Sequence, residues 1–155
     1  MQGKKVIIDA LNELLAGELS AMDLYLLQGR MCRDWGYSKL GERLVHESSD
    51  EREHADALIQ RILFLDGEPD LSKRLKMSVG KNPKEMLEND LNYELDVARN
   101  LNRVIQLCVG EGDGGTRALL ERLLRDTEGD HVFWLESQLS VIQEVGKERY
   151  LAEQM

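Results

Sequence analysis

Six side chains with metal-binding chemistry stand at regular positions in the sequence: Glu18, Glu51, His54, Glu94, Glu128 and His131. Four of them form two Glu-x-x-His motifs, in which the carboxylate and the imidazole share one face of a helix. Carboxylate oxygens and imidazole nitrogens without thiolates suit iron or manganese and not a structural zinc site. Four carboxylates balance the charge of two divalent cations, so the set predicts a two-metal site with positions left open for oxygen or water.

Four long helices are expected to position these side chains. Leu, Glu, Ala, Arg and Lys are abundant, and both prolines lie in one short region, a composition that favours helix. The expected helices run from about Lys5 to Asp34, Ser38 to Leu65, Pro83 to Val109 and Thr116 to Val145, and residues 147–155 add one or two further turns. Short breaks join antiparallel neighbours, whereas the long connection over residues 66–82 joins helices that run in the same direction. The expected fold class is therefore an all-α four-helix bundle.

The candidate ligands interrupt apolar stripes that follow the 3-4 spacing of a bundle core. The stripes are Ile7, Leu11, Leu14, Glu18, Ala21 and Tyr25; Leu40, Leu44, Glu47, Glu51, His54 and Leu58; Leu87, Leu91, Glu94, Ala98, Leu101 and Ile105; and Leu124, Glu128, His131 and Leu135. A buried carboxylate is costly unless it is paired or bound to metal. Counted from the two tight turns, the six candidates fall within roughly 6–8 Å along the bundle axis, at about 1.5 Å per residue. In the opposing interpretation these Glu and His side chains are exposed. The buried face would then have to be wrongly assigned in all four helices.

The overall composition narrows the class of protein. At 155 residues the chain fits one domain, over residues 1–155, with a sizeable core. The formal net charge of -9 disfavours a nucleic-acid binder, which needs a basic face. No apolar run approaches the roughly 20 residues that span a bilayer. Cys32 and Cys108 form no close-spaced motif and no signal-peptide pattern is present, so we expect free thiols in a reducing cytoplasm.

The ligand pattern resembles that of the ferritin-like di-iron family, in which two helices contribute one Glu each and two contribute Glu-x-x-His. Within that family the chain resembles bacterioferritin along nearly its whole length. The resemblance is carried by Glu18-Leu19 with Tyr25, Arg30-Met31, Asp34-Trp35-Gly36, His46-Glu47-Ser48, Asp50-Glu51 with His54-Ala55-Asp56, Arg61-Ile62-Leu63-Phe64-Leu65, Glu85-Met86-Leu87, Asp90-Leu91, Glu94-Leu95, His131 with Trp134-Leu135-Glu136, and Tyr150-Leu151.

This resemblance implies a ferritin-like domain that assembles into a hollow 24-subunit shell. Each subunit is expected to oxidise Fe(II) to Fe(III) with O2 or H2O2 at an internal di-iron centre, and the shell to store ferric mineral. By the same resemblance, Glu51 and Glu128 bridge the two irons. His54 and His131 each bind one iron, and Glu18 and Glu94 are the terminal carboxylates.

The resemblance also assigns roles beside the centre. Tyr25 is expected to lie next to the irons and to donate an electron, although a core tyrosine with a hydrogen-bond partner explains it equally well. His46 and Asp50 resemble the residues that bind an extra iron on the cavity surface, and a solvated pair is the alternative. Glu47 is expected to support the ligands or to contact another subunit.

One position departs from the family. Bacterioferritins usually bind haem between two subunits through a methionine directly after the bridging Glu of the second helix, and here that position is Arg52. A guanidinium stays protonated near neutral pH and has no lone pair for iron. Haem b is therefore not expected in shells of this chain alone. A homomeric shell and a shell mixed with a haem-binding bacterioferritin subunit both stay open, and a ferredoxin-type reductant is a further candidate partner.

Other functional classes fit the sequence less well. A di-iron or di-manganese oxidase or oxygenase acting on an organic substrate would use the same ligands. It would need a substrate pocket near the metals, and the chain has little length beyond its four helices. A shell protein without metals would lack at least one ligand. A DNA-protecting mini-ferritin builds its iron site between subunits and does not need both Glu-x-x-His motifs.

Overall fold

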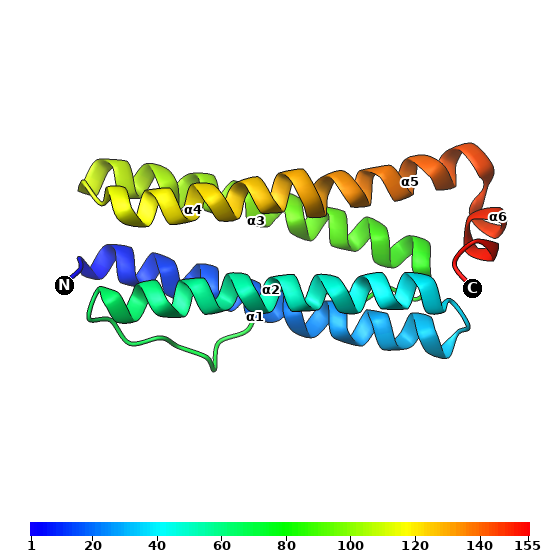
Figure 1. Cartoon of the computed structure of the whole chain (residues 1–155), viewed down its shortest axis with the longest axis horizontal. Helices are drawn as coiled ribbons and strands as arrows, with labels where there is room; N and C mark the ends of the chain where they lie inside the picture. Colours follow the sequence, from blue (N-terminus) through cyan, green and yellow to red (C-terminus); the bar gives the residue numbers. More distant parts are fainter.

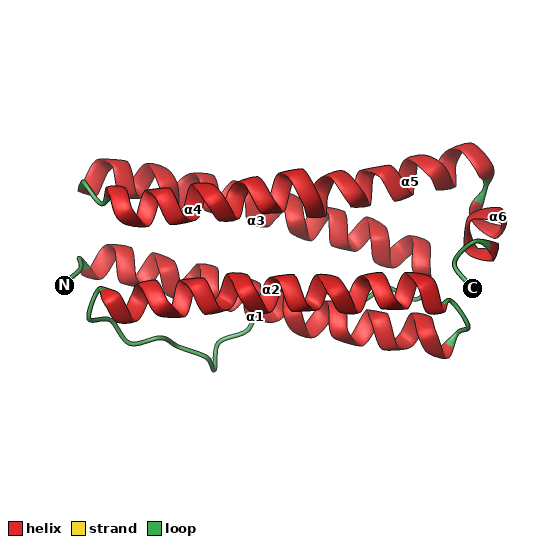
Figure 2. Cartoon of the chain, in the orientation of Figure 1, coloured by secondary structure: helices red, strands yellow, loops and turns green.

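Seven helical segments make up most of the chain in the computed structural model, which describes all 155 residues. In chain order they are α1 (Lys5–Asp34), α2 (Ser38–Phe64), α3 (Pro83–Glu111), α4 (Gly114–Asp126), η1 (Thr127–Val132), α5 (Phe133–Val145) and α6 (Lys147–Ala152). α4, η1 and α5 are continuous and form one long fourth helix, in which η1 has π-helical geometry. The chain is a four-helix bundle with the short α6 at one end (Figure 1) and contains no strand (Figure 2). The expected all-α bundle with a C-terminal helix is confirmed.

The turn between α3 and α4 is shorter than its run of glycines suggests. α3 continues to Glu111 and ends where Gly112 adopts a positive φ of 72°. The Asp113 side chain accepts a hydrogen bond from the Thr116 N–H at 2.9 Å and so caps α4. Because of this cap the fourth helix begins at Gly114, slightly before the predicted start.

The crossover of residues 65–82 is held along α1 by one stripe of polar side chains. Asn12, Ser20 and Gln28 follow one another at intervals of about two helical turns, so they share a face. Asn12 binds backbone groups near the start of the crossover. Further along, Ser20 Oγ accepts from the Leu75 N–H at 2.8 Å, and Gln28 Nε2 donates to the Val79 carbonyl at 2.8 Å. The crossover therefore follows α1 before α3 begins.

Two apolar clusters fill the bundle, one toward each end. The first contains 16 buried residues, among them Leu11 and Leu58, and the second contains 10, among them Leu40 and Leu87. Along each of the four helices, the predicted ligands lie between residues of the first cluster and residues of the second cluster. Close packing on both sides of this polar layer holds its side chains in place.

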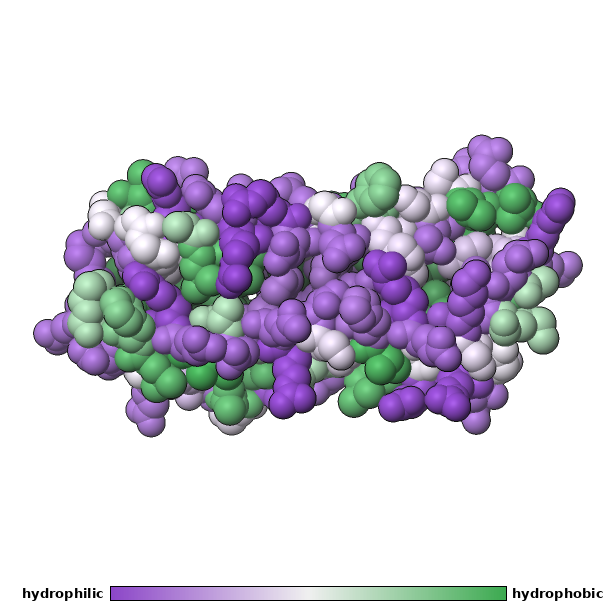
Figure 3. Space-filling model, viewed as in Figure 1, coloured by the Kyte–Doolittle hydropathy of each residue, from purple (hydrophilic) through white to green (hydrophobic).

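The surface is mainly hydrophilic, with separate apolar patches in the view of Figure 3. None of the helices combines the length and the apolar character needed to cross a membrane. Cys32 and Cys108 are both free and buried.

α1 and α2 approach each other closely at two buried glycines. A Cβ added to Gly41 would lie 2.6 Å from the Gly29 carbonyl oxygen, and one added to Gly29 would lie 2.9 Å from the Gly41 carbonyl oxygen. These obstacles are backbone atoms, which cannot move aside as a flexible side chain can. The helix pair therefore depends on the absence of side chains at both positions.

Gly41→Ala should lower the free energy of unfolding by about 1–3 kcal/mol, the usual cost of overpacking. Gly110→Ala is the matched control, because no atom lies within 4 Å of a Cβ added at this helical position. That change should raise stability by up to about 1 kcal/mol, since Ala is the better helix former. Chemical denaturation followed by circular dichroism measures both variants. Equal stability of the two would contradict the close approach.

Candidate metal centre

Five of the six predicted ligands meet in the middle of the bundle. Glu18 lies on α1, Glu51 and His54 on α2, Glu94 on α3 and His131 on η1. All five are buried, and none exposes more than 6% of its surface. Charged side chains are rarely buried to this extent unless they are paired or bind metal.

The first half of the centre consists of Glu18, Glu51 and His54. Nδ1 of His54 lies 3.6 Å from an oxygen of Glu18 and 3.5 Å from Oε2 of Glu51. One ligand atom from each of the three residues lies within 4.8 Å of the others, close enough to hold one ion. On the other side of the ring, Nε2 lies 3.3 Å from Oδ2 of Asp126, a carboxylate that orients the imidazole from outside.

The second half of the centre surrounds Nδ1 of His131. This nitrogen lies 3.0 Å from Oε1 of Glu51 and 3.5 Å from Oε1 of Glu94. Glu51 therefore directs Oε1 toward His131 and Oε2 toward His54, so that one carboxylate belongs to both halves. The two imidazole rings are 5.8 Å apart. This arrangement suits two neighbouring metal ions with Glu51 between them.

Burial and crowded charges shift the pKa values of these groups. Burial, with a smaller contribution from Glu51, raises the pKa of Glu18 to about 8. Burial alone would lower the pKa of His54, but the carboxylates of Glu18 and Glu51 raise it to about 11. The pKa of His131 is also raised, since the carboxylates of Glu47, Glu51 and Glu94 outweigh its burial. Without metal ions, the centre therefore holds protons near neutral pH.

Several buried polar atoms of the centre form no hydrogen bond. They are Oε2 of Glu18, Oε2 of Glu47, Nδ1 of His54 and Nδ1 of His131. Leaving such an atom without a partner costs about 1–3 kcal/mol. Bound metal ions would provide the missing partners, and the oxygen and nitrogen donors suit iron or manganese. The residues present therefore fit a two-metal centre.

Glu128 does not join the centre. It lies in η1 with its side chain exposed, whereas the neighbouring Thr127 is buried. The sequence prediction assumed a regular α-helix, in which residues three apart share a face. In η1 the backbone bonds span five residues, as from the Phe133 N–H to the Glu128 carbonyl, and the wider turn rotates Glu128 away from the face of His131. Around η1 the positions that face the bundle interior are four residues apart, at Leu123, Thr127, His131 and Leu135, and Val132 is buried beside them.

The remaining predicted residues lie around the centre. Tyr25 is buried, and its O–H donates to Oε1 of Glu94. Burial and the Glu94 carboxylate raise the pKa of Tyr25 well above its usual value, so the phenol stays neutral. Nε2 of the exposed His46 lies 3.7 Å from Oδ2 of Asp50, which in turn lies 4.0 Å from Nε2 of His131. His46 and Asp50 thus connect the surface to the centre.

Two further carboxylates, Glu47 and Asp126, contact the imidazoles of the centre, and the sequence did not predict these contacts. Glu47 places Oε2 2.9 Å from Nδ1 of His131 and is only 2% exposed. In the sequence, only its position on the apolar stripe of α2 indicated that Glu47 faces the interior. Asp126 has no such signal, because its contact with His54 joins two helices that are distant in sequence.

Comparison with known proteins relates the whole chain to one family. A family model described as a ferritin-like domain matches residues 8–145. The chain is 47% identical to a bacterial ferritin of Synechocystis sp. over 155 residues, which covers 100% of this chain and 99% of the relative. It is 49% identical to a bacterial ferritin of Paramagnetospirillum magnetotacticum over 152 residues, or 97% of this chain and 93% of the relative. A bacterioferritin of Brucella melitensis is 39% identical over 150 residues, or 97% of this chain and 92% of the relative.

Binding of Co(II) to the metal-free protein at pH 7 should release protons, because Glu18 and His54 hold them below raised pKa values of about 8 and about 11. The apparent affinity should rise between pH of about 6 and about 8, as Glu18 approaches its pKa. Titration calorimetry in buffers of different ionisation enthalpy counts the protons. His54→Ala should release about one proton fewer. Binding without proton release at any pH would contradict this view of the centre.

Proposed function

Because this chain belongs to the ferritin-like family, we propose that it stores iron and oxidises Fe(II) to Fe(III) with O2 or H2O2 at the buried centre. The observation that carries the proposal is the position of Glu51, whose two oxygens face the imidazoles of His54 and His131. A carboxylate shared in this way supports the binding of two Fe(II) side by side, as expected for a two-metal site.

In this proposal each half of the centre binds one Fe(II) as substrate. Glu51 bridges the pair, Glu18 and His54 bind the first ion, and Glu94 and His131 bind the second. The carboxylates favour Fe(III) over Fe(II) because they stabilise the higher charge. Each Fe(II) gives up one electron. The two electrons, with two protons, reduce O2 to H2O2 or reduce H2O2 to two waters.

Tyr25 has a separate role in the proposal. Its O–H donates to Oε1 of Glu94, so the phenol both positions this ligand and lies next to the second Fe(II). A neutral phenol in that place is suited to give up an electron together with its proton. We assign Tyr25 as an auxiliary electron donor.

A cavity beside Glu18 bears on the alternative function, an oxidase or oxygenase acting on an organic substrate. The cavity has a volume of about 400 Å³ and lies between α1, α3 and the crossover. Most of its lining is polar or charged, including Lys73, Lys76, Asp96 and Arg99. Pockets for organic ligands are predominantly apolar. The lining therefore disfavours an apolar organic substrate and, with it, the oxidase or oxygenase.

The proposed assembly is a closed shell of 24 subunits in the cytoplasm. Large apolar side chains remain exposed on the single chain: Leu26, Leu27, Leu63, Phe64 and Phe133. Side chains of this kind are suited to burial against neighbouring subunits, and closed point groups are usual for such oligomers. Arg52 is exposed and offers no ligand for haem iron, so the proposal assigns no haem to this chain. Haem in a mixed shell would come from a partner subunit, and a ferredoxin-type protein is the candidate reductant for iron release.

Fe(II) added in air should be oxidised in a fast phase of about two ions per subunit, as expected for a paired site. Glu94→Ala and His131→Ala should each abolish this phase, because each removes a side chain that would bind the second Fe(II). Stopped-flow absorbance of Fe(III) gives the rate, and circular dichroism checks the fold. Glu53→Gln, at an exposed position of α2, is the matched control and should keep the fast phase. A fast phase that survives in either centre variant would contradict the assignment.

The purified chain should form a particle of about 24 times the subunit mass, since closed symmetric assemblies bury self-complementary surfaces. Native mass spectrometry at micromolar concentration measures this directly. A monomer under these conditions would contradict the storage shell and favour the oxidase.

A further inference from the structure

The half of the centre around His131 lacks the carboxylate that Glu128 was expected to contribute. Glu51 and Glu94 face Nδ1 of His131, while Glu128 points to solvent from η1. Another carboxylate approaches the same imidazole. Glu47, one turn before Glu51 on the same face of α2, approaches the same Nδ1 at 2.9 Å.

A carboxylate that approaches the inner nitrogen of an imidazole can share its metal ion, whereas one that approaches the outer nitrogen can only orient the ring. Asp126 faces Nε2 of His54, and Asp50 faces Nε2 of His131, so both lie on the side of the ring away from the other ligands. Glu47 faces Nδ1, the nitrogen toward which Glu51 and Glu94 also point. Glu47 therefore lies on the inner side of the ring, and one ligand atom each of Glu47, Asp50 and His131 lies within 4.8 Å of the others.

The contact between Glu47 and His131 is not a hydrogen bond. Oε2 of Glu47 and Nδ1 of His131 lie 2.9 Å apart, yet neither atom has a hydrogen-bond partner. Neighbouring ligand atoms at right angles on an ion, with bonds of about 2.1 Å, are about 3 Å apart. Two buried atoms with this spacing and without mutual alignment are arranged as ligands of a common ion.

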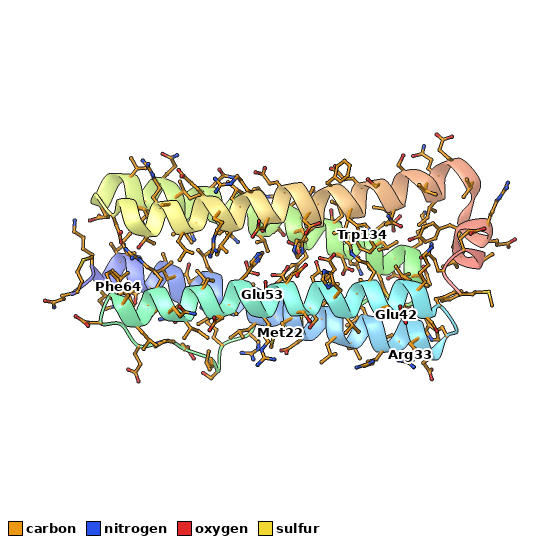
Figure 4. The ribbon with its side chains drawn as sticks, viewed as in Figure 1. Met22, Arg33, Glu42, Glu53, Phe64 and Trp134 are labelled. Atoms are coloured by element: carbon orange, nitrogen blue, oxygen red, sulfur yellow. The ribbon has the colours of Figure 1, made fainter.

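Arg43 holds the other oxygen of Glu47. Its Nε donates to Oε1 at 2.6 Å, and its guanidinium lies over the ring of Trp134, 4.5 Å from the centroid. Trp134 projects from α5 into this region (Figure 4). With Oε1 held from behind, Oε2 stays directed at the centre, which is how outer contacts orient a metal ligand.

We propose that Glu47 replaces Glu128 as the carboxylate that completes the second metal position, beside the side chains that already face Nδ1 of His131. This inference rests on the proposed function and names a ligand that the family pattern does not include. With Glu47 in this role the centre keeps four carboxylates for two divalent ions. Glu128 then remains on the outer side of η1.

Anaerobic titration of the assembled, metal-free protein with Co(II) tests the proposal. Visible absorbance follows binding, and elemental analysis gives the ions bound per subunit. Wild type, Glu128→Gln and the exposed control Glu53→Gln should bind two Co(II) per subunit. Glu47→Gln should bind one tightly and the second more than about 100-fold more weakly, a larger loss than the 10–100-fold typical of an outer contact. Crystals of the wild type with Co(II) should show anomalous density bonded to Oε2 of Glu47.

The outcomes separate this inference from the proposed function. Loss of one Co(II) in Glu128→Gln, with both retained in Glu47→Gln, would overturn the role of Glu47 and leave the two-metal centre intact. Fewer than two Co(II) in the wild type would refute the proposed function itself. If Glu47→Gln does not assemble, the crystals decide, since Co(II) bonded to Glu128 instead of Glu47 would overturn the inference.

Discussion

The burial of several carboxylates beside two imidazoles is the constraint on which the rest of the structure depends. Glu18, Glu51 and Glu94 lie buried in one layer with His54 and His131, and both desolvation and repulsion from Glu51 disfavour the charged form of Glu18. Protons on the imidazoles offset part of this cost in the absence of metal, and divalent ions would offset more. The two apolar clusters that enclose the layer stabilise the bundle around it.

The two imidazoles are held in the same manner. Each directs Nδ1 into the centre and presents Nε2 to a carboxylate outside it, Asp126 for His54 and Asp50 for His131. A carboxylate at the outer nitrogen favours the tautomer that leaves the inner nitrogen free for a metal. Outer carboxylates therefore contact both imidazoles, and on the side of His131 the contacts continue through Asp50 to His46 at the surface.

The π-helical segment decides which side chains of the fourth helix face the buried centre. A wider turn within the fourth helix rotates the residues that precede it relative to those that follow. Thr127 occupies the buried face and Glu128 leaves it, while His131 remains inside. π-helical turns are rare and occur frequently at functional sites. Here the segment contains His131, a proposed ligand, and turns Glu128 outward.

Residues in regular helices could be assigned from the sequence, and those that depend on packing between helices could not. The 3.6-residue period correctly directed Glu18, Glu51, His54 and Glu94 inward, because α1, α2 and α3 keep one phase over their whole length. The long crossover and the two tight turns were also predicted from the positions of proline and glycine, but the Asp113 cap was not. The same period misplaced Glu128, because a π-helical turn changes the phase of the fourth helix and the spacing of the residues does not reveal it. The closeness of Glu47 to Nδ1 of His131 and of Asp126 to Nε2 of His54 depends on where two helices place their side chains relative to each other. Only the tertiary structure decides such distances, since each joins residues that are more than 70 positions apart in the chain.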